Sequence, residues 1–249
     1  MTSRLVVSVS GLGGGPLDVP ARLAAELDRR SVPLSLVVTP ARLAAAPHVT
    51  DWLRGRLAGG DALLLRGSDR LAGRPRPARW PAVTAVLPAH ETRLQLIASL
   101  ATLGQLDLTV DGFAPRGWLV PPGTLDVLRR NGFRVVAELR GVRDLRSGEL
   151  MPGRVLGPGA EPWQGEHTEP WWCRAAVLGA ARAARLGRLV RIAVPAAHLA
   201  RPGIAAAVLD AVDIALHYGA RPTTYPGLVR PTLNRRQAAQ PTPARTIAS

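Results

Sequence analysis

Two arginines four residues apart, Arg66 and Arg70, follow a short apolar run in the stretch GGDALLLRGSDR. The run at 62–65 is typical of a buried strand, and Gly67 between the arginines predicts a tight turn. Many enzymes place two metal-binding histidines in this arrangement. A guanidinium is permanently charged and has no lone pair to give a metal. The spacing therefore predicts either a cationic site at a strand end or a salt-bridged structural pair.

The charge of these arginines works against a metal in the same place. Two fixed positive charges about 4 Å from a divalent cation would each repel it by roughly 8 kcal/mol at an effective dielectric near 20. Asp69 is the nearby carboxylate. We expect it to be a partner to Arg66 or Arg70, or to the loop backbone.

Other residues that could do chemistry are few. Glu166, His167 and Glu169 in the segment GEHTEPWW could in principle bind a metal, although three polar residues on a loop are usually only solvated. Ser10 with His198 suggests a nucleophile and a base, but no acid is evident to orient the histidine.

Composition narrows the class of protein. The chain has 249 residues, is 47% hydrophobic and carries a formal net charge of +14, with arginine as every basic residue. This length suits one large α/β domain, and the arginine, alanine and glycine bias is typical of a GC-rich genome. The surplus charge favours anionic partners, but the arginines are dispersed, so nucleic acid is not an expected partner. Cys173 is alone, so no intrachain disulfide is possible, and we expect it to be buried.

The sequence predicts no membrane attachment. The apolar run near the N-terminus has five residues, which is too short for a signal peptide. No run approaches the ~18 apolar residues of a membrane span. We therefore expect a cytoplasmic protein.

Apolar periodicity places the secondary structure that must position these residues. The chain begins strand, helix, strand, helix, strand, with nearly continuous apolar strands, which is the pattern of a parallel sheet or barrel covered by helices. The predicted strands are 5–9, 34–38, 62–65, 134–137, 189–194 and 223–225. The predicted helices are one capped by Asp18, a short turn after Thr39, and 50–57, 91–103, 123–130, 171–186 and 202–218. The predicted loops are 70–88, 112–118 and 141–169, the last with a possible strand near 154–156.

In this order the elements resemble the polysaccharide deacetylases of the NodB-homology type, carbohydrate esterase family four, over roughly residues 4–229. Four stretches carry the resemblance: the first strand leading into Ser10-Gly11, LLLRGSDR, GFAPRGWLVPPGTLDVLRRNGFRVV, and RIAVPAAHLARPGI. The resemblance implies a single distorted (β/α) barrel of about seven strands at residues 1–230. We expect the basic remainder, 231–249, to be a disordered tail.

The resemblance also implies a divalent metal held by an aspartate and two histidines, with a second carboxylate as base and a late histidine as acid. None of these groups is present at the matching positions. The carboxylates are replaced by Ser10 and Gly11, the two metal histidines by arginine, and the late histidine by Pro195. A one-residue shift at the last motif offers only His198. The sequence thus predicts no metal, no cofactor and no deacetylation.

Three functions remain open. The first is a catalytically inactive deacetylase-like protein that binds an anionic sugar or an acidic protein partner in the vestigial pocket. Arg116 and Trp118 would line its groove, although Trp118 could equally be plain core. The second is a hydrolase that uses other residues. The third is an interaction protein that assembles with another enzyme through its basic tail and the pair Trp171-Trp172, if these are surface anchors rather than core.

Overall fold

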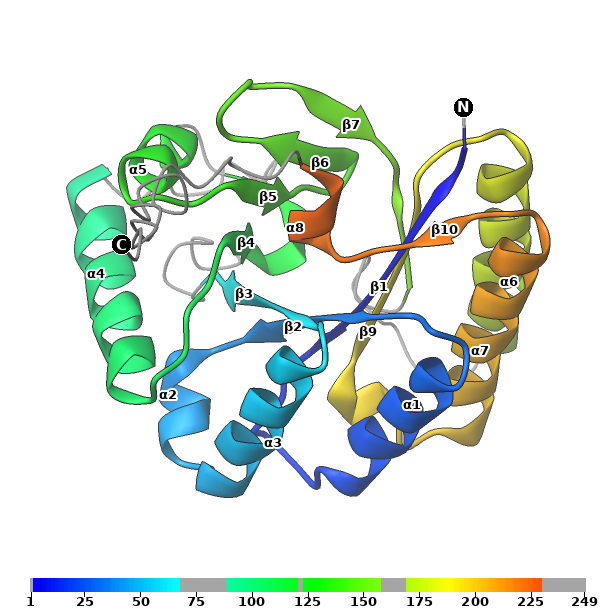
Figure 1. The fold of residues 1–249 in the computed structure, drawn as a ribbon, viewed down its shortest axis with the longest axis horizontal. Coiled ribbons are helices and arrows are strands. Elements are labelled where there is room, and N and C mark those ends of the chain that lie inside the picture. The colour runs from blue at the N-terminus through cyan, green and yellow to red at the C-terminus, as the bar shows by residue number, and fades with distance from the viewer. Residues whose placement is uncertain (1, 68–88, 121–122, 158–168, 230–249) are drawn as a thin grey trace, which may run out of the picture.

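A computed structural model of the protein describes residues 2–67, 89–120, 123–157 and 169–229 (Figure 1). Three parts of the predictions above lie outside these residues: the loop after Gly67 with Asp69 and Arg70, the pair Glu166 and His167, and the predicted tail at 231–249.

The described strands form one curled sheet in the order β7-β6-β5-β4-β3-β2-β1-β9-β8, with β10 also beside β1. Neighbouring strands are parallel, except that β6 is antiparallel to both β5 and β7. The strands are β1 Arg4–Ser10, β2 Leu34–Val38, β3 Ala62–Arg66, β4 Gly112–Ala114, β5 Val135–Ala137, β6 Gly141–Asp144, β7 Leu150–Pro152, β8 Val155–Leu156, β9 Val190–Pro195 and β10 Arg221–Pro222.

Helices surround this sheet, as Figure 1 shows. They are α1 Asp18–Asp28, α2 Pro40–Ala44, α3 Pro47–Ala58, α4 Ala89–Gln105, α5 Thr124–Arg130, α6 Glu169–Arg185, α7 Pro202–His217 and α8 Tyr225–Leu228. Short 3-10 turns cover Arg116–Trp118 and Ala196–His198. None of the helices within the described ranges is both long and apolar enough to cross a membrane.

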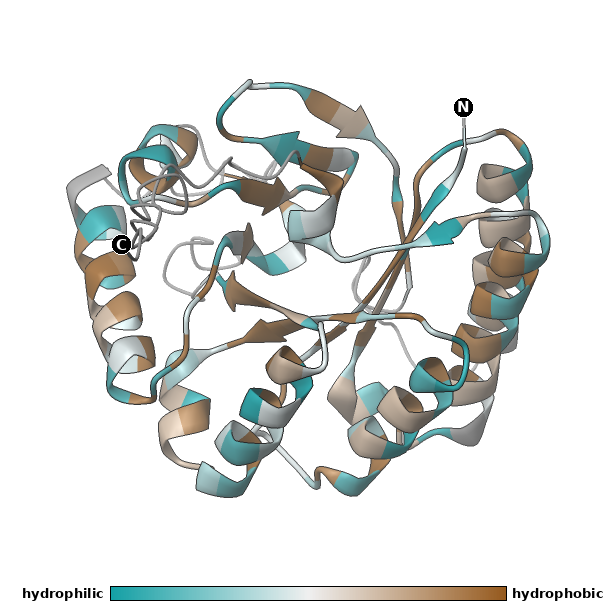
Figure 2. Ribbon diagram, viewed as in Figure 1, coloured by the Kyte–Doolittle hydropathy of each residue, from teal (hydrophilic) through white to brown (hydrophobic). Residues whose placement is uncertain are grey.

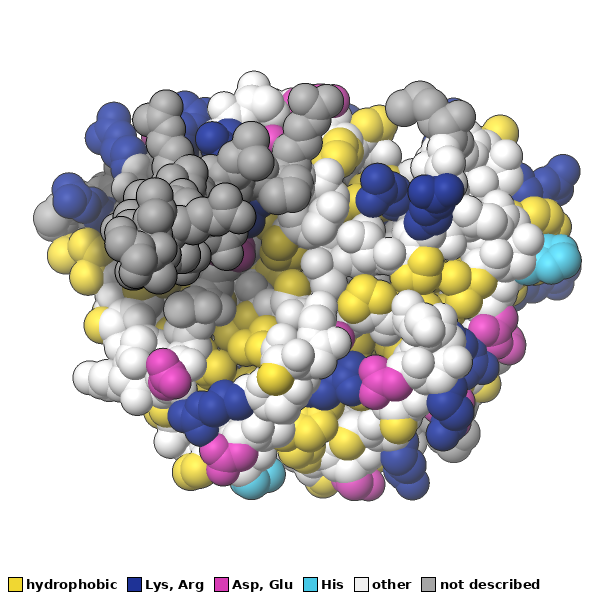
Figure 3. Space-filling model, viewed as in Figure 1, with side chains coloured by type: hydrophobic (Ala, Val, Ile, Leu, Met, Phe, Trp, Pro, Cys, Tyr) yellow, Lys and Arg dark blue, Asp and Glu magenta, His cyan; other side chains and the backbone are white. Residues whose placement is uncertain are grey.

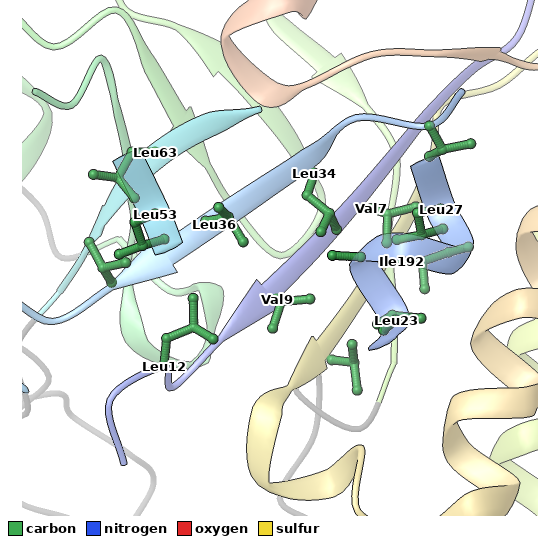
Figure 4. Packing of buried hydrophobic residues seen from close by; sticks show 14 of the residues in the cluster. Val7, Val9, Leu12, Leu23, Leu27, Leu34, Leu36, Leu53, Leu63 and Ile192 are labelled. Atoms are coloured by element: carbon green, nitrogen blue, oxygen red, sulfur yellow. The ribbon is translucent and has the colours of Figure 1, made fainter. Parts of the chain in front are cut away.

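Both faces of the sheet are buried, which explains why its strands read as continuous apolar runs. Alternate residues of β1 face outward: Leu5, Val7 and Val9 pack with the helices, for example against Leu23 and Leu27 of α1 (Figure 4). Figure 2 shows the resulting hydrophobic colour along the central strands. A fully buried leucine or valine contributes roughly 1.5–3 kcal/mol to folding, so this outer layer dominates stability.

The inner face of the sheet forms a second, smaller cluster. It contains apolar residues from eight strands together with Trp118 and Tyr225, and Tyr225 brings α8 onto this face. The inner side chains therefore fill the space enclosed by the curled sheet, as in other barrels.

Backbone hydrogen bonds join the two ends of the strand order. The N–H of Gly153 donates to the carbonyl of Arg140 at 2.9 Å, and that of Val155 donates to Leu139 at 3.3 Å. Residues 139–140 connect β5 to β6, whereas 153–155 lead into β8 at the other end of the order. The sheet thus closes on itself into the distorted (β/α) barrel that the sequence predicted.

Two segments predicted as loops contain strands. The segment 112–118 begins with β4, and 141–169 contains the antiparallel pair β6 and β7. In the same segment β8 confirms the strand predicted near 154–156. These strands have two to four residues each, too few to establish a period of two in the sequence. With β10 they raise the number of strands in the described sheet to ten, above the expected seven.

Two predicted element ends are also wrong. Leu17, not Asp18, is the N-cap of α1, and the carboxylate of Asp18 in the first turn instead lies 3.5 Å from Arg22. The stretch 223–225, predicted as a strand, starts α8. There the hydroxyl of Thr224 accepts a hydrogen bond from the N–H of Gly227 at 3.3 Å, so capping prevails over the strand preference of threonine.

Arginines are spread over the surface rather than gathered in a stripe. Figure 3 shows them interspersed with acidic side chains on the face in view. Several form ion pairs, such as Arg30 with Asp213 at 2.7 Å and Arg54 with Asp51 at 2.6 Å. This distribution differs from the clustered basic footprint of nucleic-acid-binding domains.

Candidate functional site

Five of the sequence-predicted residues lie in one place at the carboxyl ends of the parallel strands: Ser10, Arg66, Arg116, Trp118 and Pro195. Ser10 ends β1 and lies opposite Pro195 at the end of β9, while Arg66 ends β3 opposite Ala114 of β4. Ser10, Arg66 and Pro195 line a narrow cavity of about 50 Å³ together with Trp118. Barrels place their ligands at this end.

A wider cavity of about 790 Å³ adjoins the narrow one. The two share three lining residues, Arg66, Arg116 and Pro195. The wider cavity continues over the glycine-rich turn from Gly11 to Gly15, the start of α1, and Arg42 of α2. Its volume falls within the 300–1,000 Å³ typical of small-molecule sites.

Gly67 has a different role from the one its position suggested. It is not among the residues with positive φ, so no left-handed turn requires it. A Cβ there would come within 3.1 Å of the Phe113 ring and 3.2 Å of the Pro115 Cα. The N–H of Gly67 donates to the carbonyl of Ala114 at 3.0 Å. The missing side chain thus lets the segment after β4, which carries Arg116, pack against the end of β3.

Trp118 is both core and cavity wall. Its side chain is 7% exposed and belongs to the inner cluster, yet it lines the narrow cavity. Gly117 and Trp118 have φ values of 62° and 61°, a left-handed conformation that is rare for a bulky residue. Its backbone carbonyl accepts from the N–H of Leu139 at 2.8 Å. Trp118 therefore belongs to the core and also lines a cavity, which were the two roles that the sequence left open.

His198 does not join this group. It ends the turn after β9, half-buried, and it lines neither cavity. Burial lowers the pKa of His198 below its ordinary value, and nearby Arg201 acts in the same direction. A pairing of Ser10 with His198 as nucleophile and base is therefore not part of this arrangement. Asp69 and Arg70 lie outside the described residues.

Sequence reasoning missed Arg191, which lies at the centre of the barrel. It is fully buried on the inner face of β9. Its Nη1 donates to the carbonyls of Glu138, Gly141 and Gly153 at 2.6, 2.9 and 2.8 Å. These carbonyls belong to the region where the two ends of the sheet meet. A charged residue inside an apolar strand run, VRIAV, was the signal that could have found it.

Arg42 was missed as well. The sequence predicted the short helix after Thr39, but nothing local indicated that the glycine-rich turn folds against it. The described residues form no ion pair with Arg42 under 4.0 Å, and its side chain is exposed.

The residues at this barrel mouth do not fit the divalent metal that the resemblance implies. Such metals are held by histidine, cysteine and carboxylate side chains. Among the described residues lining the two cavities, Asp18 supplies the one carboxylate, and there is no histidine or cysteine. Within the described ranges, no three such side chains are grouped so that they could hold a metal ion. Of the positions where the resemblance implies metal ligands and catalytic groups, those that the structure describes present arginine, serine, glycine and proline.

No protein-family model matches the sequence, and no curated protein does so. Solved structures do match. Puue allantoinase has a TM-score of 0.65 at 13% identity, over 89% of this chain and 87% of that one. A peptidoglycan N-acetylglucosamine deacetylase has a TM-score of 0.54 at 14% identity, over 90% and 86%.

A CE4 family pseudoenzyme from Bacillus anthracis has a TM-score of 0.57 at 8% identity. The match covers 88% of this chain and 63% of the pseudoenzyme, so this chain spans somewhat less than two thirds of that protein. At these identities the comparisons bear on the fold. The chain has the fold of the CE4 polysaccharide deacetylases.

Proposed function

We propose that this protein is a polysaccharide deacetylase-like pseudoenzyme that binds an anionic sugar or an acidic partner at the mouth of its barrel. The observation that carries the proposal is Arg66 at the end of β3, beside Ser10 and Pro195 and with Arg116 on the same cavities. A cation-binding position that presents a guanidinium repels a metal and attracts an anion.

The residues around Arg66 suit binding better than catalysis. Deacetylation at such a site needs a metal-bound water, a base and an acid. Ser10 and Pro195 can supply none of the three at neutral pH. Arg66 and Arg116 can form paired hydrogen bonds with carboxylate or phosphate, and Trp118 lines the narrow cavity.

The comparisons support the proposal by analogy. One structural neighbour is described as a CE4 family pseudoenzyme, and a mutant of that protein is described as having restored enzymatic activity. Loss of activity on this fold therefore has a precedent in a protein of similar structure. Because that neighbour is longer and 8% identical, its activity and partners are not transferred.

The catalytic part of the proposal is tested with the purified full chain and acetylated chito-oligosaccharides or acetylated xylan, with added Zn²⁺ or Co²⁺. We expect acetate release no faster than in the blank. The matched positive control is an active family four esterase in the same buffer. Acetate release that stops on adding a chelator would overturn this part.

The binding part is tested by calorimetric titration at low salt with glucuronate and glucose 6-phosphate, and with neutral glucose as the control. We expect the anionic sugars to bind, with affinity falling as NaCl is raised. Arg66→Gln should weaken that binding at least 10-fold, whereas Arg182→Gln on the exposed side of α6 should not. If both anionic sugars bind no better than glucose, the pocket is not an anionic-sugar site.

A second candidate function is assembly with another protein. It is favoured by Trp171 at the start of α6, which is 72% exposed. Leu178, about two turns further along the same face of the helix, is 58% exposed. Trp172 packs against the outer core instead, so only one member of the tryptophan pair is a surface anchor. Co-purification of a stable partner that is lost in Trp171→Ser, but kept in Trp171→Phe, would support this function. A partner-free monomer would count against it.

A further inference from the structure

The turn between β1 and α1 is rich in glycine and has two residues with positive φ. Its sequence is GLGGGP at residues 11–16, and Gly11 and Gly13 have φ values of 80° and 77°. Leu12 between them is 2% exposed and anchors the turn to the core. Turns in which successive backbone N–H groups line one concavity favour anions.

The N–H groups of this turn are available to a ligand. No hydrogen bond joins the backbone N–H groups of residues 12–15 to another residue that the structure describes. The 11-residue helix α1 follows directly, without a side-chain cap at its N-terminus. Its first N–H groups and dipole add positive potential at the same place.

Arg42 supplies a charged donor from the other side of the turn. A Cβ added at Gly14 would lie 2.7 Å from Nη1 of Arg42, and one at Gly13 would lie 2.9 Å from the Arg42 carbonyl oxygen. A side chain at position 13 would meet the backbone of Arg42, and one at position 14 would push the Arg42 guanidinium away from the turn. The glycines therefore bring the N–H groups and Arg42 together on the wall of the wider cavity.

The rest of the wider cavity sets the size and type of the ligand. At about 790 Å³ it holds far more than a bare phosphate. Arg66 and Arg116 also line this cavity. Its apolar wall is formed by Leu12, Val49 and Ala197. Asp18 also lines it, but its carboxylate is turned to Arg22 at 3.5 Å. Among the described residues that line this cavity, arginines thus outnumber carboxylates.

We infer that the wider cavity binds a phosphomonoester, with its phosphate on the glycine-rich turn and Arg42. This inference rests on the proposed function and narrows its ligand class. A terminal phosphate has three acceptor oxygens and close to two negative charges at neutral pH. It can therefore accept from several turn N–H groups and a guanidinium at once, which a carboxylate with two oxygens does less completely. The organic group extends toward Arg66 and Arg116.

The test compares glucose 6-phosphate with glucuronate and glucose, which share one ring and differ in the anionic group. Calorimetric titration uses the full chain in a buffer free of phosphate and sulfate. We expect glucose 6-phosphate to bind at least 10-fold more tightly than glucuronate. Arg42→Gln and Gly14→Ala should each weaken glucose 6-phosphate binding about 10-fold or more, because the first removes the guanidinium and the second displaces it.

Arg182→Gln is the matched control, since it removes one exposed arginine from α6, which does not line the cavity. A thermal melt checks that each variant is folded. The phosphomonoester inference is overturned if glucuronate and glucose 6-phosphate bind with equal affinity and Arg66→Gln weakens the binding of both, whereas Arg42→Gln weakens neither. That result leaves the proposed function standing. Binding of neither anion overturns both. Equal weakening by Arg42→Gln and Arg182→Gln indicates nonspecific attraction and overturns the inference.

Discussion

The guanidinium carbon of Arg191 lies 5.4 Å from the centre of the Trp118 ring, on the inner face of the barrel. On another side the same group faces the Tyr225 ring at 5.2 Å. Cations lying over aromatic rings are attracted to them, more strongly when both are desolvated. One buried residue therefore connects the closure of the barrel with the wall of the candidate site.

Arg191→Leu is expected to destabilise the protein by about 3–5 kcal/mol, because three buried carbonyls lose their donor. Urea unfolding monitored by tryptophan fluorescence measures the change. Arg191→Lys keeps the charge and should lose less. Arg182→Leu, at an exposed position, should stay within about 0.5 kcal/mol of the parent. Unchanged or higher stability of Arg191→Leu would mean that the desolvation cost of the cation exceeds what its hydrogen bonds return.

Gly112→Ala is expected to destabilise the protein by about 1–3 kcal/mol through overpacking. A Cβ at Gly112 in β4 would lie 2.8 Å from Leu64 Cγ of β3 and 2.8 Å from Val135 Cγ1 of β5. Gly104→Ala is the matched control, because no atom lies within 4 Å of its added Cβ. That substitution in α4 should stabilise by roughly 0.5–1 kcal/mol. Similar unfolding midpoints for the two variants would contradict the tight approach of β3, β4 and β5.

The stability of the protein should depend on His198 between neutral and mildly acidic pH. Because burial lowers its pKa in the folded protein, the unfolded chain takes up the proton at a higher pH, near the ordinary value of about 6.5. The contribution of His198 is therefore full above that value and is lost as pH falls through the folded pKa. His198→Gln should reduce the loss of unfolding free energy between pH 7.5 and pH 5. The control is His48→Gln at an exposed position, and an unchanged loss in His198→Gln would contradict the prediction.

The strands that could be predicted from sequence are those in which several consecutive residues are buried. The strands β1, β2 and β9 are runs of five to seven residues with almost every position buried, so the apolar signal is continuous. The strands β4 and β8 have three and two residues. A strand was predicted near β8 but not at β4, whose pairing is decided by neighbours distant in sequence, such as Ala114 opposite Arg66.

The candidate site divides in the same way. Ser10, Arg66 and Pro195 could be placed because each ends a recognisable parallel strand, and the ends of such strands meet at one edge. The approach of Arg42 to Gly14 could not be predicted, because it depends on how a glycine-rich turn folds against a neighbouring helix. Arg191 was missed although it is a charge in an apolar strand, and its hydrogen-bond partners come mostly from the region that sequence reasoning left as loops.

The central place of β1 in the sheet constrains the order in which a nascent chain can fold. Strand β1 meets β9 on one side and β10, next to β2, on the other, and β9 and β10 start at residues 190 and 221. A ribosome must therefore have made most of the polypeptide before the first strand gains these partners. Until then one edge of a very apolar strand is open, and contacts this distant along the chain are associated with slow folding and with exposure to aggregation.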